Sequence, residues 1–135
     1  MVNLPPDIAA VLPERAANEQ EWQNALRLAL PRLLDVRLFR VVTGAKRIAR
    51  GGWMHGAPVG AADLNGYARG GRRIEIECKY GNSAVSAEQQ RWIEAALAWG
   101  VVAMIARYQA EETLAENILR VAAAVAMALG AEGRA

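Results

Sequence analysis

The sequence has one cysteine, Cys78, so an internal disulfide and a zinc cluster built on several cysteines are both excluded. It has no run of 18 apolar residues, so we expect no membrane-spanning helix. The first residues also lack the basic segment, followed by an apolar stretch, that marks a secretion signal. These absences predict a protein of the reducing cytoplasm, in which Cys78 packs as a small core residue.

Hydrophobic patterning predicts one α/β (α+β) domain over 18–135, preceded by an N-terminal arm over 1–17 that three prolines interrupt. Helical spacing begins after Asn18, a predicted N-cap, and Pro31 is expected to end or kink that helix. The elements expected after it are strands over 36–42, 62–68 and 73–80, a helix that Ser86 caps, a strand over 101–108 and a helix over 110–129. A further short strand near 46–50, between Gly44 and the Gly51–Gly52 pair, is an open alternative. The order α, β, β, β, α, β, α predicts a mixed central sheet flanked by helices.

Positive charge is concentrated in the middle of the chain. Residues 36–80 hold nine Lys and Arg against three acids, or +6, whereas the remainder holds seven against eleven, or −4. A basic middle predicts a surface that faces a polyanion, and nucleic acid is the polyanion we expect. The residues expected to bind DNA through this charge are Lys46, Arg47, Arg50, Arg69, Arg72 and Arg73. For the last three, a solvated turn is an equal alternative.

The stretch "IEIECKY", residues 74–80, alternates between apolar and charged side chains. Alternation puts Glu75, Glu77 and Lys79 on one face of a strand and the apolar residues on the other. A turn over 69–71 would fold this strand against 62–68, so Asp63 is expected near Glu77 and Lys79. The alternative is an ordinary solvated face with a weak surface ion pair.

Two carboxylates at one place supply the hard oxygen ligands that Mg²⁺ or Mn²⁺ prefers, and the backbone carbonyl of Cys78 would add another. Such a metal lowers the pKa of a bound water and neutralises phosphate charge. Lys79 would orient that water or stabilise developing negative charge. We expect Glu75, on the same face, to be an outer, solvated carboxylate.

Four stretches in order, spanning about residues 19–110 with the leading helix, carry a resemblance: "LFRVVTG", "GAPVGAADLNG", "RRIEIECKY" and "SAEQQRWIEAALAWG". They resemble the PD-(D/E)xK nuclease superfamily and, within it, the VRR-NUC family. The resemblance implies a restriction-endonuclease-like core and a metal-dependent DNA endonuclease, selective for branched DNA such as Holliday junctions or flaps. Such a nuclease would suit a phage or mobile element and act in the cytoplasm of a bacterial host.

The resemblance also implies a role for individual residues. The implied catalytic residues are Asp63, Glu77, Lys79 and Gln89, of which Asp63 and Glu77 would also bind the metal. Glu19 would complete the metal shell, with Glu21 as the alternative, and Arg40 would contact a phosphate.

Other features leave alternatives open. The resemblance implies a homodimer, and the Ala-rich last helix would suit packing against a second copy, or would simply cover the sheet. A second functional reading is a catalytically inactive, nuclease-derived DNA-binding or assembly module. Trp22, Trp92 and Trp99 are expected in the core, while Trp53 would stack on an unpaired base or be exposed. His55 is expected to be exposed or to reach a phosphate.

Overall fold

The computed structural model describes residues 3–43, 45–47 and 51–132. Its elements follow the chain as α1 (Pro6–Ala9), α2 (Glu19–Leu33), β1 (Val36–Arg40), β2 (Ala45–Arg47), β3 (Trp53–His55), β4 (Leu64–Ala68), a 3₁₀ turn η1 (Arg69–Gly71), β5 (Arg73–Tyr80), α3 (Ala87–Ala98), β6 (Val102–Tyr108) and α4 (Leu114–Glu132). Within the body of the protein, the predicted order of helices and strands is confirmed by α2, β1, β4, β5, α3, β6 and α4.

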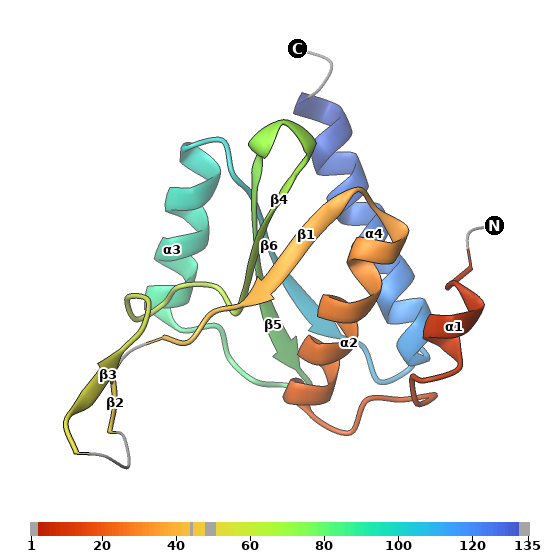
Figure 1. Ribbon diagram of the computed structural model, residues 1–135, viewed down its shortest axis with the longest axis horizontal. Coiled ribbons are helices and arrows are strands. Elements are labelled where there is room, and N and C mark those ends of the chain that lie inside the picture. Colours follow the sequence, from red (N-terminus) through yellow and green to blue (C-terminus); the bar gives the residue numbers. More distant parts are fainter. Residues whose placement is uncertain (1–2, 44, 48–50, 133–135) are drawn as a thin grey trace.

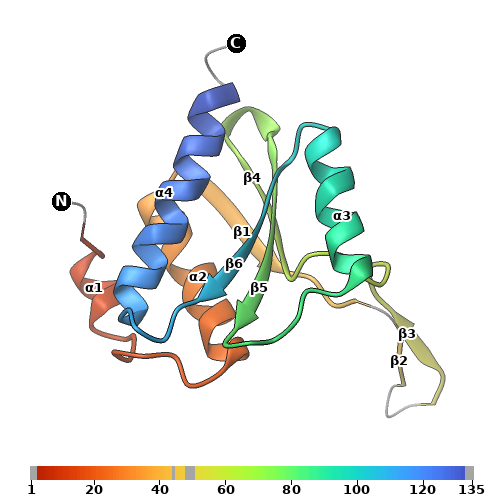
Figure 2. The same cartoon turned by 180° about the vertical axis from the view of Figure 1, so that it is seen from behind.

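The central sheet has four strands in the order β1-β4-β5-β6. The first two pairings are antiparallel, and β5 pairs with β6 in parallel because α3 makes the crossover between them. Helices α2 and α4 lie on one side of this mixed sheet and α3 lies on the other, as both views show (Figures 1 and 2). The expected mixed sheet flanked by helices is therefore present.

The main core lies between the sheet and the helix pair α2 and α4. Trp22, Leu26 and Leu30 of α2 are fully buried there, against Ile76 and Cys78 of β5. The apolar stripe of α4 fills the rest of this layer, which confirms that the last helix covers the sheet. A smaller apolar cluster joins α3 to the outer face of β6.

The N-terminus of α2 is fixed against the carboxyl ends of β5 and β6. Asn18 accepts a hydrogen bond from the Glu21 amide at 2.9 Å, which confirms it as the N-cap. Ala16 accepts from the Tyr80 hydroxyl at 2.9 Å and donates to the Tyr108 hydroxyl at 3.1 Å. These bonds set where the first residues of α2 meet the end of β5.

A two-stranded hairpin of β2 and β3 projects from the body beside the N-terminal end of α3 (Figures 1 and 2). The further strand left open near 46–50 is described only as β2, because residues 48–50 lie outside the described residues. The strand β3 was not anticipated. Its three residues follow two glycines and are too few to show a hydrophobic periodicity.

Two local expectations need correction. Pro31 was expected to end or kink its helix, and it does not end α2, which continues to Leu33. Trp99, expected in the core, is 89% exposed just past the end of α3, where the helical spacing no longer points inward. No helix within the described part of the chain has the length and apolarity needed to cross a membrane.

Candidate functional site

The charged face of β5 is buried rather than solvated. Glu75, Glu77 and Lys79 alternate along the strand on the side of α3, with Glu77 only 2% and Lys79 only 7% exposed. Burying two carboxylates and an ammonium is costly unless each finds partners, so their contacts identify what this face is built for.

Asp63 stands directly before β4 and closes the open end of the β4–β5 ladder. Continuing the register of that pair places Ala62 opposite Cys78. The amide of Cys78 donates to Asp63 Oδ2 at 2.9 Å, and the carbonyl of Ala62 accepts from Asn65 Nδ2 at 3.0 Å. The carboxylate of Asp63 therefore reaches β5 beside Glu77, as the hairpin argument predicted.

Glu77 lies at the centre of the cluster. Its Oε1 accepts from Gln89 Nε2 at 2.8 Å and lies 3.9 Å from Lys79 Nζ. Its buried Oε2 receives no hydrogen bond from a donor among the described residues, and the Asp63 carboxylate beside it can accept a proton that Glu77 carries. A buried carboxylate oxygen without a donor is expensive in a structural role and is an available ligand in a binding role.

The Glu77 carboxyl is shifted strongly toward its neutral form. Burial, and then the negative charge of Asp63, raise its pKa from 4.5 to about 8, and the positive charge of Lys79 opposes the rise. A carboxyl with such a pKa beside a second carboxylate marks a place where a cation would replace a proton.

Gln89 is held so that its amide must face Glu77. Its Oε1 accepts from the Ser86 amide at 3.0 Å while its own backbone amide donates to the Ser86 hydroxyl at 3.1 Å, which forms a capping box. The side-chain Nε2 is then left pointing at Glu77. The predicted cap of α3 and the predicted site glutamine are thus parts of one local structure.

The loop before Asp63 packs closely on the same turn of α3. Gly60 has φ +95°, and a Cβ placed on it would lie 2.7 Å from the Glu88 carbonyl oxygen. Only glycine fits here, since the backbone conformation and the close approach both exclude a side chain. Gly60 therefore helps to hold Asp63 and Gln89 in one site.

Glu19 and Glu21, the two candidates for the third metal-binding acid, have different surroundings in the structure. Glu21 Oε1 accepts from the Ala17 amide at 3.0 Å, so its carboxylate is occupied in capping α2. Glu19 is exposed at the first position of the helix. Its charge adds to those of Asp63 and Glu77 in raising the pKa of the Cys78 thiol, a rise that is caused first by burial. Of the two acids, Glu19 is the one whose charge acts on Cys78, the residue after Glu77.

The donors present fit a hard divalent cation in their chemistry. Asp63 and Glu77 offer carboxylate oxygens, and the carbonyl of Cys78 points to the same side of β5 as the amide that Asp63 binds. Across residues 3–43, 45–47 and 51–132, however, no three His, Cys, Asp or Glu side chains gather closely enough to hold a metal. A cation here would complete its coordination with backbone, water or phosphate oxygens.

The basic residues expected to bind DNA fall into three groups. Arg40 is exposed at the end of β1. Lys46 and Arg47 lie on β2, where side chains are not described, and Arg50 lies outside the described residues, as do the side chains of Trp53 and His55 on β3. The three turn arginines lie at the other end of the β4–β5 hairpin from Asp63.

These turn arginines make bonds within the protein. Arg69 pairs with Asp35, and Arg73 pairs with Asn65 and with Glu75, whose Oε2 is 3.3 Å from Arg73 Nε. Arg72 donates to the Ala128 carbonyl at 3.1 Å and to the Gly100 carbonyl at 3.3 Å. Because these three arginines already bond within the protein, the solvated or structural turn is better supported than direct binding of DNA by them.

Glu75 was expected to be solvated and is instead buried. Trp92 of α3, expected in the apolar core, donates from Nε1 to Glu75 Oε1 at 2.6 Å. Alternation alone cannot distinguish a solvated acid from one that a helix covers, because it fixes the face of the strand and not what packs on that face. A tryptophan one turn after Gln89 on the same helix was the available signal, since the two meet alternate residues of β5.

No family model, curated protein or solved structure matches this chain.

Proposed function

We propose that the protein is a metal-dependent DNA endonuclease of the PD-(D/E)xK type, resembling the VRR-NUC family. The single observation that carries the proposal is the meeting of Asp63, Glu77 and Lys79 at one end of the sheet, with a buried Glu77 oxygen that receives no hydrogen bond from a donor among the described residues. A structural role leaves that arrangement unexplained, since a well-packed apolar cluster would stabilise the fold at less cost.

In this proposal, Asp63, Glu77 and the Cys78 carbonyl hold Mg²⁺ or Mn²⁺, and exposed Glu19 adds a carboxylate at the rim. When bound, such a metal supplies a water of lowered pKa and neutralises charge on the phosphate.

The remaining steps belong to the chain itself. Gln89, fixed by its capping box, holds the Glu77 carboxylate in place. Lys79 Nζ lies beside Glu77 and would stabilise the negative charge that develops on the phosphoryl oxygens. Arg40, exposed near the end of β1 that reaches Asp63, would position a neighbouring phosphate.

A branched or flap DNA is the proposed substrate, and a homodimer is the proposed assembly. The outer face of α4 carries exposed Ala123, Ala124 and Met127, which would allow a second copy to approach closely. Sedimentation at micromolar concentration is expected to give the mass of two chains, and the mass of one chain would remove the dimer from the proposal.

The test of function uses labelled four-way junction, flap, duplex and single-stranded DNA with Mg²⁺, Mn²⁺ or EDTA. Wild-type protein is expected to cut branched or flap DNA with either metal and not with EDTA. Asp63→Ala and Lys79→Ala are expected to lower the rate at least about 100-fold while retaining DNA binding. Glu88→Gln, on the exposed side of the same region, is the matched control and should cut normally.

The second functional reading has its own outcome in this assay. If wild-type protein binds the branched substrates but cuts none of them with either metal, the inactive DNA-binding module is the correct function. The scarcity of clustered metal-ligating side chains within the described residues is the observation that favours it.

A further inference from the structure

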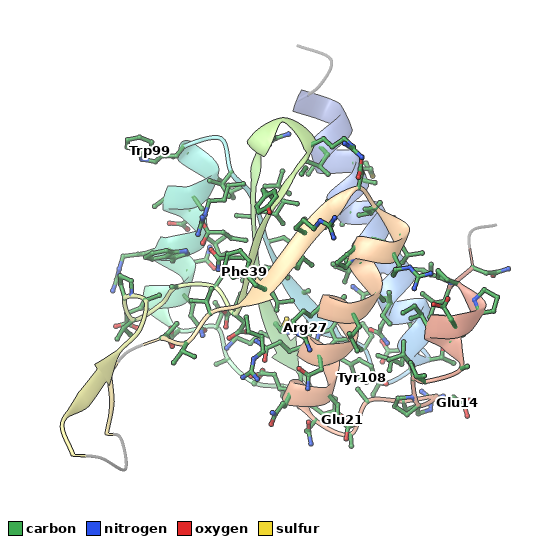
Figure 3. All side chains as sticks on the ribbon, in the orientation of Figure 1. Glu14, Glu21, Arg27, Phe39, Trp99 and Tyr108 are labelled. Carbon is green, nitrogen blue, oxygen red and sulfur yellow. The ribbon has the colours of Figure 1, made fainter. Side chains whose placement is uncertain are left out.

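Two aromatic side chains lie open on the sheet face that carries the candidate site. Phe39 of β1 is 48% exposed and Tyr67 of β4 is 52% exposed. Phe39 pairs with Asn65, and Asn65 alternates with Tyr67 and with Asp63, so all of these residues share one face. Helix α3 packs on β5 and β6 on this side, and Figure 3 shows Phe39 on β1.

The strand register places Phe39 and Tyr67 in a row that continues from the candidate site. The Val41 amide donates to the Asp63 carbonyl at 2.8 Å, which extends the β1–β4 pairing as far as Asp63. Phe39 lies opposite Asn65, so its two diagonal neighbours on β4 and the residues before it are Asp63 and Tyr67. Such neighbours lie about 7–8 Å apart, so the two rings form a row that begins beside Asp63.

Positive charge without a partner accompanies this row. Arg37 lies opposite Tyr67 in the register and therefore shares its face. It is exposed, and its guanidinium has no hydrogen-bond or ion-pair partner among the described residues. Beyond Tyr67, a recess of about 600 Å³ is lined in part by Arg37, Tyr67 and Arg69. The row therefore joins aromatic faces to the free cation of Arg37, which is the combination that binds single-stranded nucleic acid.

From this surface we propose that Phe39 and Tyr67 stack on the bases of an unpaired DNA strand and that Arg37 contacts its phosphates. The surface would lead a flap or the single strand of a branch to Asp63. The inference rests on the proposed nuclease function and names its substrate class. A duplex cannot use the rings in this way, because the faces of its bases are already stacked on each other.

The test measures binding in EDTA, so that it needs neither metal nor cleavage. Fluorescein-labelled oligothymidylate and a duplex of the same length are titrated with protein at fixed salt. Phe39→Ala is expected to weaken binding of the single strand about 5-fold or more, and Phe39→Trp to restore it, since one stacked base contributes that much. Phe39→Leu, which keeps an apolar side chain without a flat face, should resemble Phe39→Ala. Duplex binding should change little in all three.

Trp99→Ala is the matched control, because it removes another exposed aromatic ring just past the end of α3 (Figure 3), at the opposite end of that helix from Gln89. It should bind both DNAs like the wild type. Equal binding of the single strand by Phe39→Ala and wild type would overturn the inference, as would an equal loss for single strand and duplex. If Phe39→Ala instead lowers the mass of the protein in solution and leaves DNA binding unchanged, the surface joins two copies and the inference is wrong.

The two proposals fail separately. Phe39-dependent binding of single strands by a protein that cuts no DNA with Mg²⁺ or Mn²⁺ would support the stacking surface and overturn the nuclease. Cleavage of branched DNA at the same rate by Phe39→Ala and wild type would support the nuclease and overturn the stacking surface.

Discussion

Glu77 is the residue whose state governs the site, because its pKa is raised from 4.5 to about 8, first by burial and then by Asp63. Between these two values the folded protein keeps a proton that the unfolded chain has lost. The free energy of unfolding must therefore fall as pH rises through this window, by up to about 1.4 kcal/mol for each pH unit.

Glu77→Gln, which imitates the protonated side chain, is expected to remove this decline. Urea unfolding at pH 5.5 and pH 8.5, in EDTA, compares the variant with the wild type. The wild type should lose stability toward pH 8.5 and the variant should lose much less. Equal losses in the two proteins would show that Glu77 is not the group that titrates.

Glu19 and Glu21 lie two positions apart at the start of α2, and we predict different effects when each is replaced. Glu21 accepts from the Ala17 amide, so Glu21→Ala should lower stability by about 1 kcal/mol. Glu19→Ala should leave stability almost unchanged and weaken the stabilisation by Mn²⁺. Thermal melting with and without Mn²⁺ measures both effects. If Glu19→Ala lost stability and Glu21→Ala lost the stabilisation by Mn²⁺, the two acids would have exchanged roles.

At the scale of elements, the site depends on how α3 meets the loop that precedes β4. A Cβ at Gly60 would lie 2.7 Å from the Glu88 carbonyl oxygen, whereas Gly70, with φ +83°, has open space around it. Both alanine variants carry the strain of a positive φ, of about 1–2 kcal/mol. Gly60→Ala alone also overpacks, at a further cost of about 1–3 kcal/mol.

Thermal melting and a DNA cleavage assay should therefore rank Gly60→Ala below Gly70→Ala in both stability and activity. A Gly60→Ala variant that matches Gly70→Ala would mean that the contact between this loop and α3 is not needed to hold Asp63 and Gln89 together.

Most elements could be predicted because their signals are local. Asn18 and Ser86 were identified as caps from residue type and position, and the alternation over 73–80 gave the strand and its two faces. What the sequence could not give was what packs against each face. Glu75 and Trp99 show this, since one is buried under α3 and the other is exposed just past its end. Pro31 does not end its helix because α2 packs into the core on both sides of it.

At the scale of the whole molecule, several features meet at one end of the sheet. Asp63 before β4, Glu77 and Lys79 of β5, and Gln89 at the start of α3 lie together. The β2–β3 hairpin leaves the body beside the start of α3 (Figure 1). The basic stretch 36–80 contributes the hairpin and the strands β1, β4 and β5. The aromatic row of Phe39 and Tyr67 runs from this end of the sheet toward the η1 turn.

The most direct measurement is a titration of the protein with Mn²⁺ followed by electron paramagnetic resonance, which reports free Mn²⁺. Wild-type protein and Glu75→Gln, which alters a carboxylate that Trp92 and Arg73 already occupy, are expected to bind Mn²⁺ at a saturable site that is tighter at pH 8.5 than at pH 6.5. Asp63→Asn should lose that site. Wild-type protein that leaves Mn²⁺ free at millimolar concentration, or Asp63→Asn that binds as well as the wild type, would contradict a metal centre formed by Asp63 and Glu77.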